Sequence, residues 1–286
     1  MKKQKNENVS YLSEVLDKLK EHKMAMAGLV VLIVEILMVV FLPMILKLDP
    51  YTSDYTAFSA APGGAHILGT DAIGRDVFAR LMYGGRTSLL VGFVSTLISC
   101  AIGVPLGLVA GYARGKAEAV IMRIADMMLA FPGLVLALAV AGIMGASIKN
   151  AIIAIVVVSW TKDARLARSL VMKIRDRDYV SAAIVTGSKT PYMLFRYMLP
   201  NALPTLIITA ATDIGSMMLE LAAMSFLGFG AKPPAPEWGY MLNEGRACMQ
   251  SAPWLMIFPG LAIFVVVVVF NMLGDSIRDI LDPRNE

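Results

Sequence analysis

The chain has 286 residues, of which 57% are hydrophobic and 17% are charged, and its formal net charge is +4. This composition excludes an ordinary soluble domain and indicates a protein whose solvent is a lipid bilayer. The excess of Lys and Arg is typical of membrane orientation and does not indicate nucleic-acid binding. The two cysteines, Cys100 and Cys248, form no CxxC pair and predict no disulfide framework.

Hydrophobic stretches predict the membrane spans. A spanning helix needs about 20 mostly apolar residues, and five stretches come near or exceed that length. They are residues 24–46, 87–112, 120–145, 203–228 and 254–273. We count the shorter stretch 148–160 as a sixth span, because an odd total would place the basic segment after it on the wrong side. Residues 24–46 lack a small-x-small cleavage site at their end and are predicted to be a retained anchor.

The distribution of basic residues predicts the orientation. With six spans and the tail 1–23 inside, most of the 26 Lys and Arg residues fall in inner segments. Both termini are therefore predicted to be cytoplasmic. The outer segments 47–86 and 229–253 are rich in Gly and Pro and are predicted to form ordered caps over the outer mouth. After the tail we expect one domain, residues 24–286.

A polar stretch interrupts the apolar blocks on the inner side. Residues 161–183 carry Leu166, Leu170 and Ile174 near helical spacing, with charges on the other face, which predicts an amphipathic cytoplasmic helix. Thr161 or Asp163 could cap its start. Gly187 is expected to end it, and a proline-marked boundary starts the next element. We expect a soluble partner to bind this compact cytoplasmic element.

The segment "SAAIVTGSKTPYMLFRYMLP" (181–200) resembles the coupling-loop signature of bacterial ABC importer permeases, EAA-x3-G-x9-I-x-L-P. Ser181 replaces the Glu of that signature and Tyr197 replaces the Ile. Two outer segments, "HILGTDAIGRDVFARLMYGGRTSL" and "MSFLGFGAKPPAPEWGYMLNEGR", closely resemble the C-type permease of dipeptide, oligopeptide and nickel importers. The residues that the resemblance assigns to coupling with the ATPase are Ser181, Ala182, Ala183, Gly187, Leu199 and Pro200.

The resemblance implies an all-α integral membrane protein with the type I ABC importer permease fold. Six transmembrane helices are expected, with a first helix and outer loop in 24–86, core helices in 87–273, a cytoplasmic coupling helix, and a short cytoplasmic C-terminus in 274–286. The implied partners are a B-type permease that completes a heterodimer, two cytosolic ATP-binding subunits and an extracellular or periplasmic substrate-binding protein. The implied location is the bacterial inner membrane.

The chain itself is not expected to be an enzyme and carries no catalytic residues or cofactor. It has no phosphate-binding G-x-x-x-x-G-K-[ST] loop, because Thr70 and Asp71 follow residues 64–69. ATP and Mg²⁺ are therefore expected on the partner ATPase subunits.

One face of residues 203–228 is the candidate translocation path. Asp213, Met217, Glu220 and Met224 recur at i, i+4, i+7 and i+11. Two carboxylates and two thioethers would suit a cationic or metal-chelate substrate, although this mixture of hard and soft donors does not define a metal site. The alternative is a helix–helix contact in which Met fills space. His22 and His66 have no second ligand at metal-site spacing.

Other charged residues are expected to be structural. Arg123 and Asp126, three apart on one helix, are predicted to pair with each other. Asp71, Arg75 and Asp76 are predicted to pair with one another or with the partner permease. Glu35 has no obvious partner although it lies in a span, where a charge is costly.

The substrate is left open between nickel, or a nickel chelate, and di- or oligopeptides. The stretch "TDIGSMMLELAAMSFLG" is nearer to nickel-type permeases, which slightly favours nickel. A secondary transporter driven by an ion gradient is the alternative class, but the chain has no detectable internal repeat. An intramembrane enzyme is disfavoured because neither His lies in a span.

Overall fold

The computed structural model describes residues 23–281, and this part of the chain is helical apart from its connecting loops. Residues 1–22 of the predicted tail 1–23, and residues 282–286, lie outside the described residues. Within the described part, β-pairing is limited to isolated bridges in the segment before α3. The predicted all-α class is confirmed.

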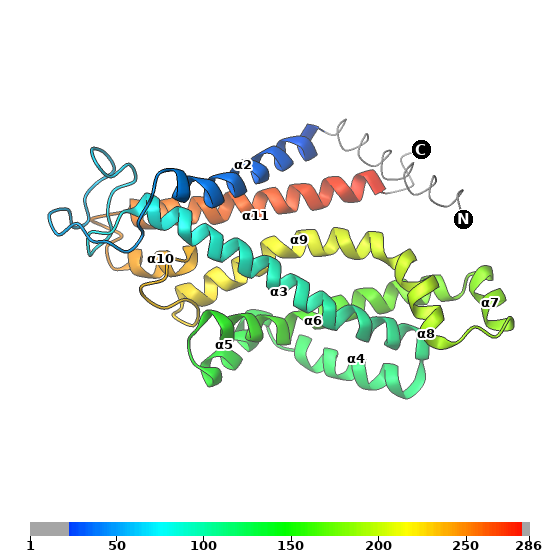
Figure 1. Ribbon diagram of the computed structural model, residues 1–286. Helices are drawn as coiled ribbons and strands as arrows, with labels where there is room; N and C mark the ends of the chain where they lie inside the picture. Colours follow the sequence, from blue (N-terminus) through cyan, green and yellow to red (C-terminus); the bar gives the residue numbers. More distant parts are fainter. Residues whose placement is uncertain (1–22, 282–286) are drawn as a thin grey trace.

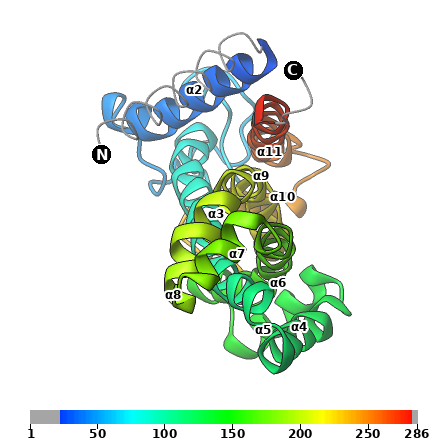
Figure 2. The ribbon, with the colours of Figure 1, turned by 90° about the vertical axis from the view of Figure 1, so that its right-hand side faces the viewer.

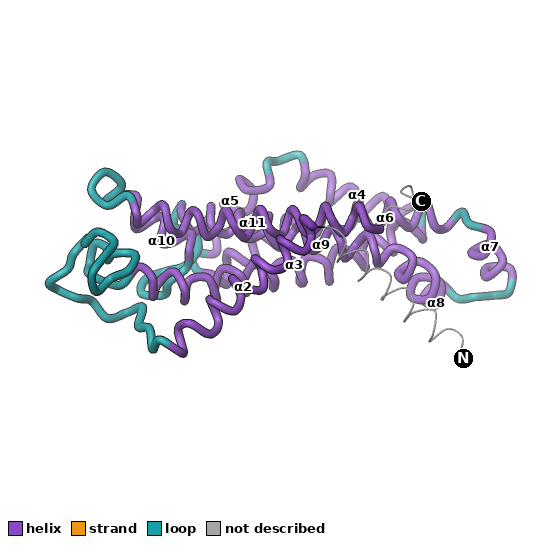
Figure 3. The backbone as a smooth tube through the Cα atoms, turned by 90° about the horizontal axis from the view of Figure 1, so that it is seen from above, coloured by secondary structure: helices purple, strands orange, loops and turns teal. Residues whose placement is uncertain are grey.

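Long helices run along one axis of the molecule (Figure 1). The outer loop between α2 and α3 and the short helix α10 lie at one end, and α7 and α8 lie at the other (Figures 1 and 3). In chain order the elements are α2 (Lys23–Ile45), α3 (Val77–Ala113), α4 (Gly115–Leu129), α5 (Gly133–Met144), α6 (Ile148–Arg175), α7 (Asp178–Val185), α8 (Thr190–Met193), the π-helix η1 (Leu194–Met198), α9 (Leu199–Phe226), α10 (Trp238–Arg246) and α11 (Trp254–Leu281).

The predicted count of six spans is not confirmed. Four described helices are long and apolar enough to cross a membrane, and α4 with α5 makes a fifth if the pair counts as one span. The predicted span 120–145 is not one continuous helix, because α4 and α5 are bent by 91° at their break. Pro132 lies at this break, and a proline disfavours helical backbone at the residue before it.

The predicted short span 148–160 and the predicted amphipathic helix after it are one continuous helix, α6. Its N-cap is Ser147, whose Oγ accepts a hydrogen bond from the backbone N of Asn150 at 3.1 Å. The predicted caps Thr161 and Asp163 are instead buried in the middle of α6. α3 also begins earlier than the predicted span 87–112, at Val77.

Three layers are visible when the molecule is viewed along its axis. α2 and α11 lie together on one side, α3, α6 and α9 form the middle, and α4 and α5 lie on the opposite side (Figure 2). The middle layer is held by close contact between α3 and α6. A Cβ added at Gly107 would lie only 2.3 Å from the carbonyl oxygen of Ala164, and Gly103 and Gly111 face α6 almost as closely. Small residues at four-residue spacing allow this approach of two backbones.

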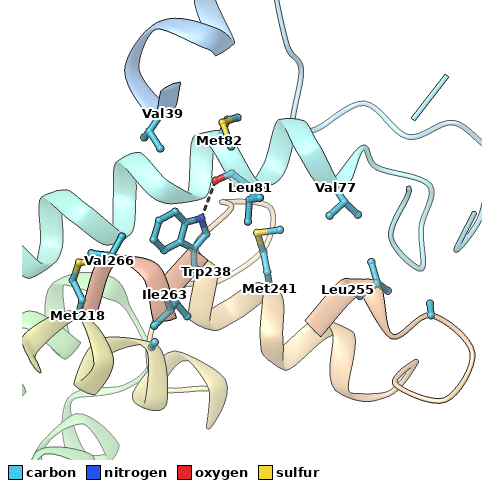
Figure 4. Close-up of a cluster of buried hydrophobic side chains, with 12 residues drawn as sticks. Val39, Val77, Leu81, Met82, Met218, Trp238, Met241, Leu255, Ile263 and Val266 are labelled. Atoms are coloured by element: carbon cyan, nitrogen blue, oxygen red, sulfur yellow. Dashed lines mark hydrogen bonds between the residues drawn. The ribbon is translucent and has the colours of Figure 1, made fainter. Parts of the chain in front are cut away.

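A hydrophobic cluster joins the helices at the end that carries α10 (Figure 4). At its centre is Trp238, the first residue of α10. Its indole packs against α3, and its Nε1 donates to the carbonyl oxygen of Leu81 at 2.8 Å. Val39 of α2, Met218 of α9 and Ile263 of α11 complete the cluster. Five helices are therefore anchored around one side chain whose polar atom is satisfied.

Arg86 of α3 donates hydrogen bonds to backbone carbonyls of α2 near a proline inside that helix. Pro43 lies inside α2 and has no N–H, so the carbonyl of Val39 lacks its helical donor. The Arg86 guanidinium donates to that carbonyl oxygen at 2.8 Å from Nε, and to the carbonyl oxygen of Val40 at 2.6 Å from Nη2. The contact gives the carbonyl of Val39 a donor in place of the N–H that Pro43 lacks.

We expect Arg86→Gln to lower the free energy of unfolding of the detergent-solubilised protein by about 1–3 kcal/mol, because a carbonyl loses a charged donor. The loss should shrink in a Pro43→Ala background, where residue 43 regains an N–H for Val39. Thermal unfolding of the four proteins of this double-mutant cycle measures both effects. An equal loss in the two backgrounds would show that Arg86 does not act through the freed carbonyl.

Candidate functional site

The first candidate site is α7, at the end of the molecule away from the outer loop (Figure 1). A Schellman turn ends this helix. The N–H of Gly187 donates to the carbonyl oxygen of Ile184 at 2.9 Å, and the N–H of Ser188 donates to that of Ala183 at 3.1 Å. Gly187 has a φ of +83°, a conformation that glycine adopts without a steric penalty. Gly187 therefore ends the helix, as predicted, but the helix is the separate short α7.

One face of α7 is fixed to the rest of the chain. Val180 and Ala183 are buried in a cluster with Leu108 of α3, Val171 of α6 and Met198 of η1. These contacts join α7 to the two central helices, α3 and α6. Ala183, one of the residues that the resemblance assigns to coupling, is therefore buried and packs inside the protein.

The opposite face of α7 is exposed. Ile184 is 51% exposed and Val185 is 87% exposed, although both are apolar. Ser181, Ala182 and Gly187 are exposed beside them. We call these five residues the α7 tip. Two exposed apolar side chains, Ile184 and Val185, thus lie next to each other at this turn.

The last two predicted coupling residues lie elsewhere. Leu199 and Pro200 begin α9, and α8 and η1 separate them from α7. Leu199 is half-buried and packs against the same cluster as Val180. These residues join the α7 region to α9 and do not belong to the α7 tip.

The predicted face of α9 is divided between two environments. Met217 and Met224 are buried in a cluster formed with α3, α5 and α6. Asp213 and Glu220 are half-buried. Neither carboxylate has a hydrogen bond or ion pair with any described residue, and their charges interact with Lys162 of α6. Met217 and Met224 thus pack in the core, as in the alternative interpretation of this face. The two carboxylates keep hydrogen-bond acceptor sites that no described residue uses.

Asp163 of α6 is a further buried carboxylate near this face. Its Oδ2 accepts a hydrogen bond from Ser99 Oγ of α3 at 2.6 Å. Its charge also interacts with that of Asp213. The sequence predicted Thr161 or Asp163 as a helix cap and did not predict the contact of Asp163 with Ser99. The available signal was an aspartate directly after the apolar stretch 148–160.

No group of three or more His, Cys, Asp or Glu within residues 23–281 could hold a metal ion. The membrane carboxylate Glu35 of α2 has one oxygen, Oε2, that is buried without a hydrogen-bond partner among the described residues.

A buried ion-pair network ties the outer loop to α10. Arg75 Nε lies 2.6 Å from Asp71 Oδ2, which confirms the predicted pairing of these two residues. Arg75 Nη2 also contacts Glu244 Oε1 at 2.7 Å, and Arg80 lies between Asp71 and Glu244. Burial raises the pKa of Glu244, and its contact with Arg75 opposes that shift. Arg80 and Glu244 were not predicted, because 164 residues separate them in the chain.

Asp76 is not part of this network. Its Oδ1 caps α3 by accepting from the backbone N of Ala79 at 2.8 Å, and its Oδ2 contacts Nδ1 of His66 at 2.8 Å. Nε2 of His66 lies 3.6 Å from Asp54. His66 therefore links two parts of the outer loop to the start of α3.

The predicted pair of Arg123 with Asp126 is wrong. Asp126 forms its ion pair with Arg165 of α6, and Glu118 of α4 pairs with Arg168 of α6. The carboxylates of α4 face α6, and a partner on a packed helix is closer than one on the same helix.

Two family models match this chain, and both describe transport proteins. Residues 103–286 match the family model described as binding-protein-dependent transport system inner membrane component. Residues 10–62 match the N-terminal TM domain of oligopeptide transport permease C.

Individual relatives cover almost the whole chain. The chain is 42% identical to the dipeptide transport system permease protein DppC of Alkalihalophilus pseudofirmus, over 96% of this chain and 91% of the relative. It is 43% identical to the DppC of Haemophilus influenzae, over 93% and 92% of the two chains. It is 42% identical to the glutathione transport system permease protein GsiD of Pectobacterium atrosepticum, over 93% and 88%.

A solved structure shares the fold. A chain of the MetNI methionine ABC transporter in an inward-facing conformation aligns with a TM-score of 0.58 at 18% identity, covering 70% of this chain and 95% of that chain.

The His66 contacts give the outer loop a dependence on pH. Hydrogen bonding to Asp76 raises the pKa of His66 above its ordinary 6.5, although burial opposes the shift. The stabilisation should be complete below pH 6.5 and lost as the pH rises through the raised pKa. We expect protease resistance of the loop to fall over that range, and to be low and independent of pH in His66→Gln. A pH profile that is unchanged in the variant would contradict this role.

Proposed function

The chain belongs to the binding-protein-dependent inner membrane components of ABC importers, and we propose that it forms half of the translocation pathway of an ATP-driven importer of short peptides. As a permease subunit it is a transport component and not an enzyme. Family membership also removes the alternative of a transporter driven by an ion gradient. The observation that carries the proposal is the α7 tip, an exposed apolar turn fixed to the central helices.

Peptides are the proposed substrate instead of nickel. The relatives compared above are named for dipeptides and glutathione, and they give the initial preference for nickel no support. A short peptide carries an ammonium group at its N-terminus. Asp213 and Glu220 offer unpaired carboxylates that suit such a group, because charge-assisted hydrogen bonds are stronger than neutral ones.

The α7 tip is the proposed docking surface for an ATP-binding subunit. The described ends of α2 and α11 lie toward the same end of the molecule as α7 (Figure 1). This arrangement supports the expectation that the two termini and the α7 tip share the cytoplasmic side of the inner membrane. The outer loop and α10 would then face the substrate-binding protein at the opposite end.

A B-type permease would complete the pathway as the second half of a heterodimer. Residues 24–286 would act as one transmembrane domain. In this assembly ATP and Mg²⁺ are held by two cytosolic ATPase subunits, and closure of those subunits moves α7. Because Val180 and Ala183 pack against α3 and α6, the movement reaches the helices beside Asp213. The cycle is a two-state equilibrium that nucleotide binding biases.

We expect Val185→Asp to abolish most ATP-dependent uptake and to reduce co-purification of the ATPase subunits. A charge would replace an 87% exposed apolar side chain at the proposed docking surface. Tyr55→Asp is the matched control, because Tyr55 is 79% exposed on the outer loop; this variant should retain its ATPase subunits. Normal uptake by Val185→Asp would remove α7 from the coupling role.

The proposed role of Asp213 and Glu220 is tested by comparing the uptake of two dipeptides, one with a free N-terminus and one N-acetylated. We expect Asp213→Asn with Glu220→Gln to lower uptake of a dipeptide with a free N-terminus about ten-fold, equivalent to the ~1.4 kcal/mol of a charged contact. Uptake of the N-acetylated dipeptide should change much less, because it has no ammonium group. Met217→Leu, a volume-conserving change in the core of the same helix, serves as the control. Equal losses for both peptides would assign the carboxylates to structure.

A further inference from the structure

A basic groove lies between α4 and α6, in the half of the molecule that carries α7 (Figure 1). Its volume is about 740 Å³, and it is open to the surface. The side chains that matter for its chemistry are Glu118, Met122, Arg123, Asp126, Arg165 and Arg168. Neither the α7 tip nor the α9 carboxylates belong to it.

Ion pairs between the two helices leave one cation of the groove unpaired. Arg168 Nε donates to Glu118 Oε1 at 2.8 Å, and Arg165 pairs with Asp126. Arg123 has no hydrogen bond or ion pair with any residue between 23 and 281. Three guanidinium groups face two carboxylates, so the groove carries one net positive charge.

An apolar surface lies beside the groove on the same helix. Val120, Ile124 and Met127 recur at i, i+4 and i+7 of α4, and all three are exposed. The residues that line the groove, such as Arg123 and Asp126, occupy the neighbouring face. α4 thus presents a charged face and an exposed apolar face side by side.

We propose that this groove binds the headgroup phosphate of an anionic phospholipid. The Arg123 guanidinium would take the phosphate, since its planar donors match two phosphate oxygens. The acyl chains would lie along Val120, Ile124 and Met127. A phosphodiester with a single negative charge neutralises the groove, and basic pockets between helices at the cytoplasmic surface are a known form of lipid site. A free phosphate ion would leave the apolar face unused.

The bound lipid would connect the broken helix pair to the rest of the fold. α4 is joined to α6 near the groove by the Glu118 and Asp126 ion pairs, and α5 begins beyond the 91° break. A phosphate held by Arg123 and by the outer nitrogens of the paired arginines would hold α4 and α6 together. This inference does not depend on the substrate or on ATPase docking.

The test uses the assembled importer, purified in detergent from membranes that contain phosphatidylcholine and phosphatidylglycerol. The lipid that stays with the complex is extracted and quantified. We expect phosphatidylglycerol enrichment in the wild type and a loss of about five-fold in Arg123→Gln, the size expected for one basic residue near a membrane surface. Lys116→Gln is the matched control, because Lys116 is an exposed cation of α4 that does not line the groove.

Three outcomes would overturn the proposal. An equal loss in Lys116→Gln and Arg123→Gln would show diffuse attraction and no defined site, and no loss in Arg123→Gln would leave the groove without lipid. A third arm adds excess inorganic phosphate during purification. We expect the lipid to remain, and complete displacement by the free ion would mean that the groove is an anion site with no lipid specificity. Arg123→Gln should fold normally, because Arg123 makes no ion pair, and thermal unfolding in phosphatidylcholine checks this.

Discussion

The close approach of α3 and α6 is the contact on which the other helices depend. Gly103, Gly107 and Gly111 place no side chain of α3 between these helices, so the two backbones come close together. Dispersion contacts at such short range stabilise helix pairs in a bilayer, where apolar lipid provides little hydrophobic drive. α7 packs on this pair through Val180, and α9 lies against both helices. The two candidate surfaces are therefore built on one rigid unit.

Polar groups in the membrane region follow a second constraint, because lipid cannot hydrogen-bond to them. Arg86 satisfies the carbonyls that Pro43 affects, and Ser99 donates to Asp163. Asp213 and Glu220 differ from these, because they have no hydrogen bond or ion pair within the described part of the chain. Unpaired carboxylates are retained where they face water, a ligand or another subunit. This difference in hydrogen bonding supports the proposal that Asp213 and Glu220 contact substrate, whereas Arg86 and Asp163 make internal contacts of the fold.

The two ends of the molecule are held in different ways. The outer end is fixed by the Trp238 cluster and by the ion pairs of Glu244, which satisfy buried charges. The α7 end exposes Ile184 and Val185 and has unpaired charge in the groove at Arg123. This contrast supports the proposed arrangement, in which substrate arrives at the α10 end and the ATPase subunits bind at the α7 end.

The sequence by itself determined the features that depend on local chemistry. Apolar composition fixed the helical membrane class, and Gly187 fixed the end of α7, because a positive φ at a helix end requires only the residue and its neighbours. Only the tertiary structure decided which charges pair across helices and which faces of the helices are buried. Asp126 binds Arg165, 39 residues away, and Met217 enters the core while Asp213 does not. These outcomes depend on which helix packs against each face, and helical periodicity defines the faces but not their neighbours.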